Sequence, residues 1–176
     1  ASTTVAMAIG DALAVVWMEK SGVSKSDFAL NHPSGRLGRK LTLRVSDLMI
    51  KSEEFKFLLE DASFLEIISE LTRGGMGICC IKKKFSENEL SGLITDGDLR
   101  RTLRKYPPND WEFLIAKEFM TKDPIVISPN RYAADALELM EKNRKKPITI
   151  LPVIGDNSDF LGILKLHDLV QAGLSE

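Results

Sequence analysis

The chain has 176 residues, of which 44% are hydrophobic, and its 24 basic and 25 acidic side chains give a formal net charge of −1. This composition is typical of a globular protein with one good-sized core or two small ones, and it excludes a disordered chain. The balanced charge excludes a general attraction to nucleic acid or to an anionic membrane, so we predict neither as a partner.

The first predicted element is an amphipathic helix over residues 2–20. Its apolar residues recur three and four positions apart, which is the spacing of one helix face: Val5, Ala8, Ile9, Ala12, Leu13, Val16 and Trp17. We expect Thr3 or Thr4 to cap the helix and Gly22 to end it. The apolar run over 5–18 is shorter than the roughly 20 residues that cross a bilayer, and no basic start precedes it, so it predicts neither a membrane span nor a secretory signal.

The next segment, SKSDFALNHPSGRLGRKL over 24–41, predicts a loop with at most a short helix. Pro33, Gly35 and Gly38 interrupt it. The first helix therefore has an apolar face but no partner before the next unit begins. We infer that residues 1–43 are the end of a larger domain and that the chain is a fragment.

From residue 45 onward, one order of elements occurs twice. In the first copy we expect strands near 55–59 and over 77–83 and 90–94, with helices from about Ser63 and Thr95. In the second copy we expect strands near 125–127 and over 148–154 and 160–164, with helices from about Arg131 and Lys165.

The spacing between the copies is nearly constant. Seventy positions separate Gly92 from Gly162 and Asp98 from Asp168. This period is longer than the roughly 20 to 50 residues of solenoid repeats, so it predicts a duplicated β-α-β-β-α domain of the α+β class. We assign the copies to 44–106 and 116–176, joined by a linker over 107–115.

The cysteines indicate a reducing compartment. Cys79 and Cys80 are neighbours on a predicted strand, so their side chains point to opposite faces and we expect no disulfide. We therefore place the protein in the cytoplasm.

Both copies end in one pattern: glycine, an apolar residue, any residue, a fourth position, two of any residue, and aspartate. The segments are GLITDGD over 92–98 and GILKLHD over 162–168, and only the first has threonine at the fourth position. Over 45–173 the chain resembles a tandem cystathionine-β-synthase (CBS) domain pair. The resemblance implies two sheets about a pseudo-twofold axis, with clefts that in many members bind adenosine nucleotides or related ligands.

Polar residues at the end of the first copy have two interpretations. Gly92 lets another backbone approach, and Thr95 stands where a helix begins, whose amide groups and hydroxyl suit a phosphate. Asp98 is an acceptor suited to the hydroxyls of a ribose, and the family resemblance implies the same roles. The alternative is that Thr95 only caps the helix and Asp98 only complements its dipole.

The second copy departs from this pattern. Lys165 stands at the threonine position, whereas the aspartate is kept as Asp168. A lysine can bind phosphate as a point charge but cannot cap a helix, which argues against ordinary nucleotide binding there, although both remain candidate ligand contacts. His167 is expected to be a surface or packing residue. The basic runs over 82–84 and 142–146 are expected on solvated faces or loop rims, and the alternative is that either contributes a cation to a phosphate.

The head of the chain resembles the junction in the D-arabinose 5-phosphate isomerases, where a sugar isomerase (SIS) domain precedes a CBS pair. The resemblance rests on TTVAMAIGDALAVVWMEKSG and on the motif His-Pro-any-Gly-any-Leu-Gly beginning at His32. It implies a parent enzyme that interconverts D-ribulose 5-phosphate and D-arabinose 5-phosphate for the lipopolysaccharide sugar Kdo. It also implies that His32 is the catalytic base of the parent, and a plain turn residue is the alternative. Because nothing in the fragment is expected to hold the sugar phosphate over His32, we predict no isomerase activity for the chain itself.

Three functions remain open. The CBS pair is a regulatory module for a nucleotide or nucleotide-sugar effector, a structural module that dimerises the enzyme, or a pair attached to an unrelated enzyme or transporter. We favour the first, with a homodimer of the fragment, a homo-oligomer of the parent, and no cofactor or metal site.

Overall fold

A computed structural model describes residues 2–24, 27, 36–73, 75–84, 88–142 and 148–174. In chain order the elements are α1 (Ser2–Lys20), α3 (Arg36–Thr42), α4 (Val45–Leu48), β1 (Ile50–Lys51), the 3-10 helix η1 (Ser52–Glu54), β2 (Phe57–Leu59), α5 (Phe64–Arg73), β3 (Ile78–Lys82), β4 (Leu90–Thr95), α6 (Asp96–Lys105), the 3-10 helix η2 (Pro108–Phe113), α7 (Ala116–Phe119), β5 (Thr121–Lys122), α8 (Ala133–Lys142), β6 (Ile150–Ile154), β7 (Phe160–Lys165) and α9 (Leu166–Gln171).

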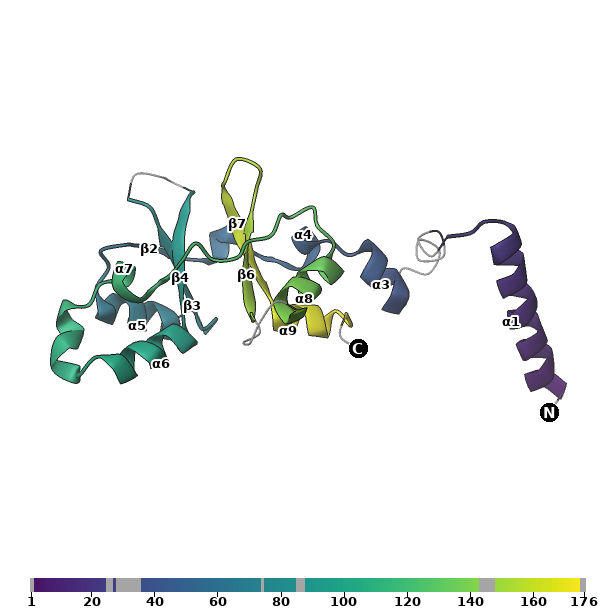
Figure 1. Cartoon of the computed structure of the whole chain (residues 1–176), viewed down its shortest axis with the longest axis horizontal. Coiled ribbons are helices and arrows are strands. Elements are labelled where there is room, and N and C mark those ends of the chain that lie inside the picture. The colour runs from purple at the N-terminus through teal and green to yellow at the C-terminus, as the bar shows by residue number, and fades with distance from the viewer. Residues whose placement is uncertain are drawn as a thin grey trace.

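Two sheets stand next to each other in the body of the protein, and each contains a strand from the other copy (Figure 1). The first sheet has the order β2-β3-β4-β5, although β5 follows the linker and belongs by sequence to the second copy. The second has the order β1-β7-β6, although β1 begins the first copy. Because both exchanged strands pair antiparallel with the last strand of the other copy, neither copy completes its sheet alone.

Glycine makes this exchange possible at both strand contacts. A Cβ atom on Gly92 would lie 2.6 Å from the carbonyl oxygen of Thr121, and one on Gly162 would lie 2.1 Å from that of Ile50. Both distances are shorter than a carbon atom tolerates, so only glycine lets the exchanged strand approach. The close backbone approach that the sequence predicts at Gly92 is therefore present.

The short helices α4 and α7 come directly before the exchanged strands. The start of each is hydrogen-bonded to a segment of the other copy. Four backbone hydrogen bonds hold them there: Val45 N to Arg131 O at 3.0 Å, Ala133 N to Leu43 O at 2.8 Å, Phe64 N to Leu114 O at 3.1 Å, and Ala116 N to Ala62 O at 2.9 Å. Backbone groups buried at this crossing are thereby paired, which avoids the cost of leaving them unsatisfied.

Three apolar cores hold the structure together. One lies between the first sheet and its helices and includes Ile67 and Ile94, and another lies under the second sheet and includes Leu151 and Leu164. The third contains side chains of both sheets, among them Phe160. Full burial of such side chains contributes about 1.5 to 3 kcal/mol each, so the cores fix the sheets against their helices and against each other.

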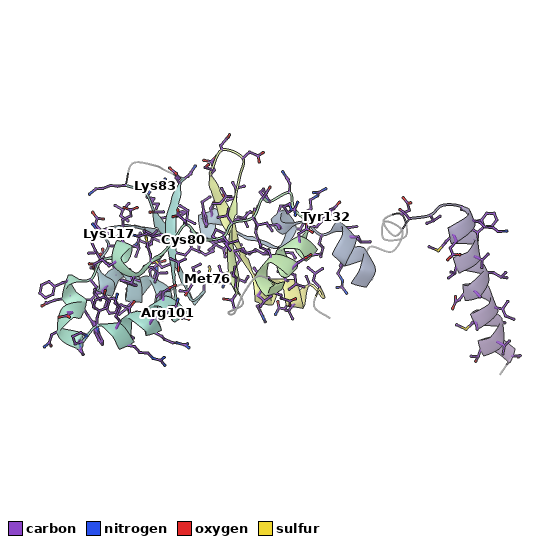
Figure 2. The ribbon with its side chains drawn as sticks, viewed as in Figure 1. Met76, Cys80, Lys83, Arg101, Lys117 and Tyr132 are labelled. Carbon is purple, nitrogen blue, oxygen red and sulfur yellow. The ribbon has the colours of Figure 1, made fainter. Side chains whose placement is uncertain are left out.

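The two cysteines show the alternation of β3. Cys79 lies in the core under the first sheet, whereas Cys80 lies in the core between the sheets (Figure 2). Both thiols are free and buried, and burial raises the pKa of Cys79 to about 12 and raises that of Cys80 as well. The prediction that they point to opposite faces without a disulfide is confirmed.

Helix α1 confirms the helix that was predicted over 2–20, but the details of its ends and faces differ. Thr3 and Thr4 lie inside the helix, so the prediction that either caps it is wrong. Gly22 ends it with a left-handed φ of 67°. No residue of α1 is buried, and Trp17 is 72% exposed, because the helix lies apart from the sheets (Figure 1). No helix of the described residues is long and apolar enough to cross a membrane.

Two other expectations need correction. Gly38 does not interrupt structure, since it lies buried inside α3, which packs against α8. The strand expected near 125–127 is reduced to a single parallel bridge between Ile127 and Val153, and β5 lies earlier in the chain. Asp123 has a φ of 45° and Pro124 has no amide hydrogen, so the strand cannot continue through this point.

We predict that Gly162→Ala lowers the free energy of unfolding by about 2 to 3 kcal/mol, because the methyl group meets the backbone of β1. Urea denaturation measures the loss. Gly155→Ala is the matched control, because its Cβ atom would meet the side chain of Leu161 at 3.2 Å and that side chain can move, so we expect less than about 1 kcal/mol. Equal losses in the two variants would contradict the role given to Gly162.

Candidate functional site

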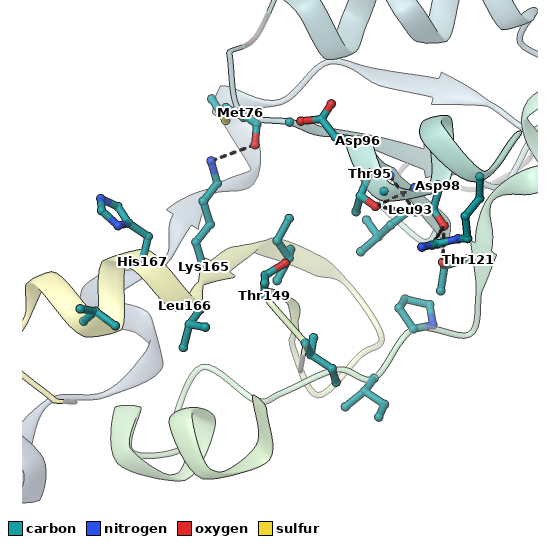
Figure 3. Close-up of a pocket in the computed structure, with 18 residues that line it drawn as sticks. Met76, Leu93, Thr95, Asp96, Asp98, Thr121, Thr149, Lys165, Leu166 and His167 are labelled. Carbon is teal, nitrogen blue, oxygen red and sulfur yellow. Dashed lines mark hydrogen bonds and ion pairs between the residues drawn. The ribbon is translucent and has the colours of Figure 1, made fainter. Parts of the chain in front are cut away.

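A cleft of about 850 Å³ lies where the two copies meet (Figure 3). The first copy contributes Met76, two residues before β3, and the beginning of α6. The second copy contributes the segment around Ile125, the start of β6, and Lys165 at the start of α9. The cleft is therefore a product of the strand exchange and does not belong to either copy alone.

Thr95 and Asp98 form a reciprocal cap at the start of α6. The Thr95 hydroxyl accepts a hydrogen bond from the Asp98 amide at 3.3 Å. In return, Asp98 Oδ2 accepts from the Thr95 amide at 2.9 Å and from its hydroxyl at 2.7 Å. Threonine followed three residues later by an acidic residue favours this arrangement, so the helix begins where the sequence predicts. The capping interpretation is present in the structure, and ligand binding stays a prediction.

The second oxygen of Asp98 is also occupied. Asp98 Oδ1 accepts from Arg101 Nη2 at 2.6 Å and from the Thr121 hydroxyl at 3.3 Å. A carboxylate offers about four acceptor positions, so the Thr95 amide and hydroxyl together with these two donors fill it. The carboxylate is only 7% exposed, and the Arg101 guanidinium compensates the charge that burial would otherwise penalise.

The second copy builds no such cap. Lys165 precedes α9 and makes no side-chain capping hydrogen bond, and instead its ammonium donates to the Met76 carbonyl oxygen of the first copy at 3.1 Å (Figure 3). Among the described residues no group hydrogen-bonds to the buried Oδ2 of Asp168. Asp168 is not part of the cleft wall, although its neighbour His167 is. The structure thus brings together Thr95, Asp98 and Lys165 at the cleft and leaves Asp168 behind it.

His167 also borders the cleft, whereas the remaining predicted residues that the structure describes lie elsewhere. His167 is exposed, and its Nε2 lies 2.9 Å from Gln171 Nε2. The basic run over 82–84 is away from the cleft, where Lys84 pairs with Asp61 at 3.1 Å. His32 and most of the run over 142–146 lie outside the described residues. Within the part of the chain that is described, no cluster of histidine, cysteine and acidic side chains could hold a metal ion.

Sequence reasoning missed Arg101 and Thr121. Arg101 follows Asp98 by three positions on a helix, a spacing at which opposite charges pair, so this contact was detectable. Thr121 had no such signal, because it reaches Asp98 only through the exchange of β5 onto β4.

Comparison with known proteins is consistent with this architecture. The family described as CBS domain matches residues 116–175. Arabinose 5-phosphate isomerase KdsD of Yersinia pestis is 39% identical over 173 residues, and KdsD of Escherichia coli (strain K12) is 37% identical over 174 residues. Both alignments cover 98% of this chain and 50% of the relative, so the chain spans half the length of these proteins.

Solved structures with low sequence identity share the fold. A complex of CBSX2 with AMP has a TM-score of 0.61 at 20% identity, covering 75% of this chain and 96% of that one. The CBS domain of a bacterial CNNM/CorC family Mg2+ transporter in complex with ATP has a TM-score of 0.66 at 14% identity, covering 80% of this chain and 92% of that one. The predicted α+β fold of a CBS-domain pair is confirmed.

We expect Thr95→Val to lower the free energy of unfolding by about 1 to 2 kcal/mol, because it removes the cap of α6. Thr72→Val is the control, since the Thr72 hydroxyl only donates to the Ile68 carbonyl within an exposed helix turn and its loss should cost less than about 0.5 kcal/mol. Chemical denaturation compares the two. If Thr95→Val behaved like the control, the cap would not stabilise the start of the cleft.

Proposed function

We propose, from the premise that this chain is a CBS-domain pair related to the CBS-containing part of the arabinose 5-phosphate isomerases, that its cleft binds a nucleotide or nucleotide-sugar effector. The observation that carries this proposal is the cleft of about 850 Å³ between the copies, with the start of α6 in its wall. Its volume lies within the range of small-molecule sites, about 300 to 1,000 Å³. AMP and ATP complexes in proteins of this fold support it.

The cleft wall has an apolar part and a polar part, which suits a ligand with an aromatic base and a phosphate. Apolar side chains of Leu93, Ile125 and Ile150 offer contact for a base, whereas the start of α6 offers the partial positive charge of a helix end to a phosphate. Thr95 stands at that end, where its hydroxyl donates to Asp98 Oδ2 in the cap. A ligand with an aromatic base and a phosphate can therefore contact both parts at once.

Binding of a ribose diol requires an exchange at Asp98, because both carboxylate oxygens are already occupied. The two ligand hydroxyls replace Arg101 and Thr121 at Oδ1, while the cap at Oδ2 remains. Arg101 is 63% exposed in its side chain, so its guanidinium is then free to turn toward a phosphate. Asp98 and Arg101 thus act together as the ligand-binding pair.

Replacement of the donors at Asp98 by a ligand could regulate the parent through the packing of the two copies. Helix α3 lies at the end of residues 1–43 and packs against α8, and its Arg39 approaches Gly173 after α9. A ligand that changes how the two copies meet would therefore shift the segment that leads to residues 1–43. Regulation requires two states with different affinity for the ligand.

The parent activity belongs to the same proposal. We take residues 1–43 as the end of a sugar isomerase domain and the parent as an isomerase of D-ribulose 5-phosphate and D-arabinose 5-phosphate, with His32 as its base. Its reaction moves a proton between adjacent carbons, for which an imidazole is suited near neutral pH. Free buried thiols at Cys79 and Cys80 support a cytoplasmic location.

A structural role is the second candidate, and one observation favours it. Leu65 of α5 is 73% exposed and Phe113 of η2 is 74% exposed at the end of the first copy. Exposed side chains of this size are favourable contacts for a second copy, so a homodimer through this end is the alternative to ligand sensing.

The ligand proposal is tested by thermal-shift titration with AMP, ADP, ATP, CMP and CMP-Kdo. At about a hundred times its dissociation constant, a ligand adds roughly 2.7 kcal/mol of stability. We expect a shift with at least one compound that is lost in Asp98→Ala and reduced in Arg101→Ala. The control Asp61→Ala removes an exposed carboxylate away from the cleft and should keep the full shift. No shift with any compound would leave the dimerising role as the better explanation.

We also expect no interconversion of D-ribulose 5-phosphate and D-arabinose 5-phosphate by this chain alone. The Asp98 carboxylate at the cleft is filled by four donors, and His167 is an exposed side chain near Gln171, so neither of these two groups is positioned as a base over a sugar. A coupled assay for D-arabinose 5-phosphate measures the rate. Turnover above the rate without protein would overturn this expectation.

A further inference from the structure

The two halves of the cleft region are equivalent by duplication but are not occupied alike. In the first half, Thr95 and the start of β6 both line the cleft, whose wall also includes Met76 and Lys165 of the second half. In the second half, the equivalent position is Lys165, whose ammonium donates to the Met76 carbonyl oxygen at 3.1 Å (Figure 3). This contact joins residues 89 positions apart and connects the second copy to the first.

Strand register places Met76 on the far wall of the second half. Ile78 pairs with Thr95 in the first sheet as Ile150 pairs with Lys165 in the second. Met76, two residues before Ile78, is therefore the equivalent of Ile148, which lines the open first half. By this symmetry the Lys165 side chain extends from the helix wall to the opposite wall, through the space that a ligand would fill.

Other substitutions in the second half remove the groups that serve Asp98 in the first. Thr121 pairs with Leu93 in the first sheet, and Ile50 pairs with the equivalent residue Ile163 in the second. Ile50 therefore takes the place of Thr121, and the second half has no hydroxyl at this position. Gln171 stands at the position of Arg101 and lies beside His167 instead. The equivalent carboxylate, Asp168, keeps one buried oxygen without a hydrogen bond from the described residues.

We propose that Lys165 is the resident occupant of the second half-site, so that the protein binds one nucleotide per chain, in the half that contains Thr95 and Asp98. The lysine replaces a ligand there and joins the two copies through the Met76 carbonyl. This stoichiometry rests on the proposed nucleotide-binding function, whereas the occupancy of the half-site by the lysine does not.

The first experiment tests occupancy without any nucleotide. Reductive methylation with formaldehyde, followed by mass spectrometry, compares Lys165 with Lys117, an exposed lysine on α7 (Figure 2). We expect Lys165 to react about tenfold more slowly, because its amine is held by a carbonyl group. Equal rates for the two lysines would overturn the proposal, whether or not the protein binds nucleotides.

The second experiment counts bound ATP by isothermal titration calorimetry. We expect one ATP per chain in the wild type, two in Lys165→Thr, and one in the double variant Asp98→Ala with Lys165→Thr, which keeps only the opened second half-site. Lys117→Thr is the control and should bind one. Lys165→Ala, which removes the side chain that spans the half-site, serves if the threonine variant does not fold, and it should also gain a second ATP.

Two ATP molecules bound per chain of the wild type would overturn the role of Lys165 as occupant. If the wild type binds one ATP, a folded Lys165 variant that gains no second ATP would overturn it as well. No ATP binding by the wild type together with slow methylation of Lys165 would contradict nucleotide binding for this probe but support the occupied half-site. Failure of nucleotide binding can therefore be distinguished from failure of the proposed occupancy by Lys165.

Discussion

The exchange of β1 and β5 between the two copies is the constraint on which the rest of the structure depends. Each exchanged strand approaches so closely that a side chain at Gly92 or Gly162 would collide with its backbone. Once the strands have crossed, the start of each copy is held by the sheet of the other, and a cleft with walls from both copies follows. The hydrogen bond between Thr121 and Asp98 exists only because of this crossing.

Duplication supplied two equivalent half-sites, and a few substitutions made them chemically different. A threonine is short enough to cap its own helix, and it leaves the space in front of it open. A lysine at the equivalent position is long enough to reach the opposite wall, where a carbonyl oxygen accepts a hydrogen bond from its ammonium. The two halves can therefore do different things within one backbone frame: one is open, and the other is spanned by a side chain.

The charge arrangement around Asp98 suits a switch better than a rigid anchor. Its cap on α6 is made by a residue three positions away, whereas the bonds from Arg101 and Thr121 come from an exposed side chain and from the other copy. A hydrogen bond to a charged group contributes about 1.5 to 3 kcal/mol, which lies within the range of about 1 to 3 kcal/mol for coupling between allosteric sites. Exchange of one or two such bonds is thus sufficient in size to connect a ligand to the packing of the two copies.

Local spacing determined much of this protein from its sequence alone. The cap between Thr95 and Asp98 and the opposite faces of Cys79 and Cys80 depend on residues within a few positions of each other. The duplicated order of elements was visible from the constant spacing of seventy positions. Only the tertiary structure decided the strand exchange, the contact of Thr121 with Asp98 across 23 positions, and that of Lys165 with Met76 across 89. Such contacts leave no periodic signal in a single sequence, because they depend on which strand pairs with which and not on the spacing of residues along the chain.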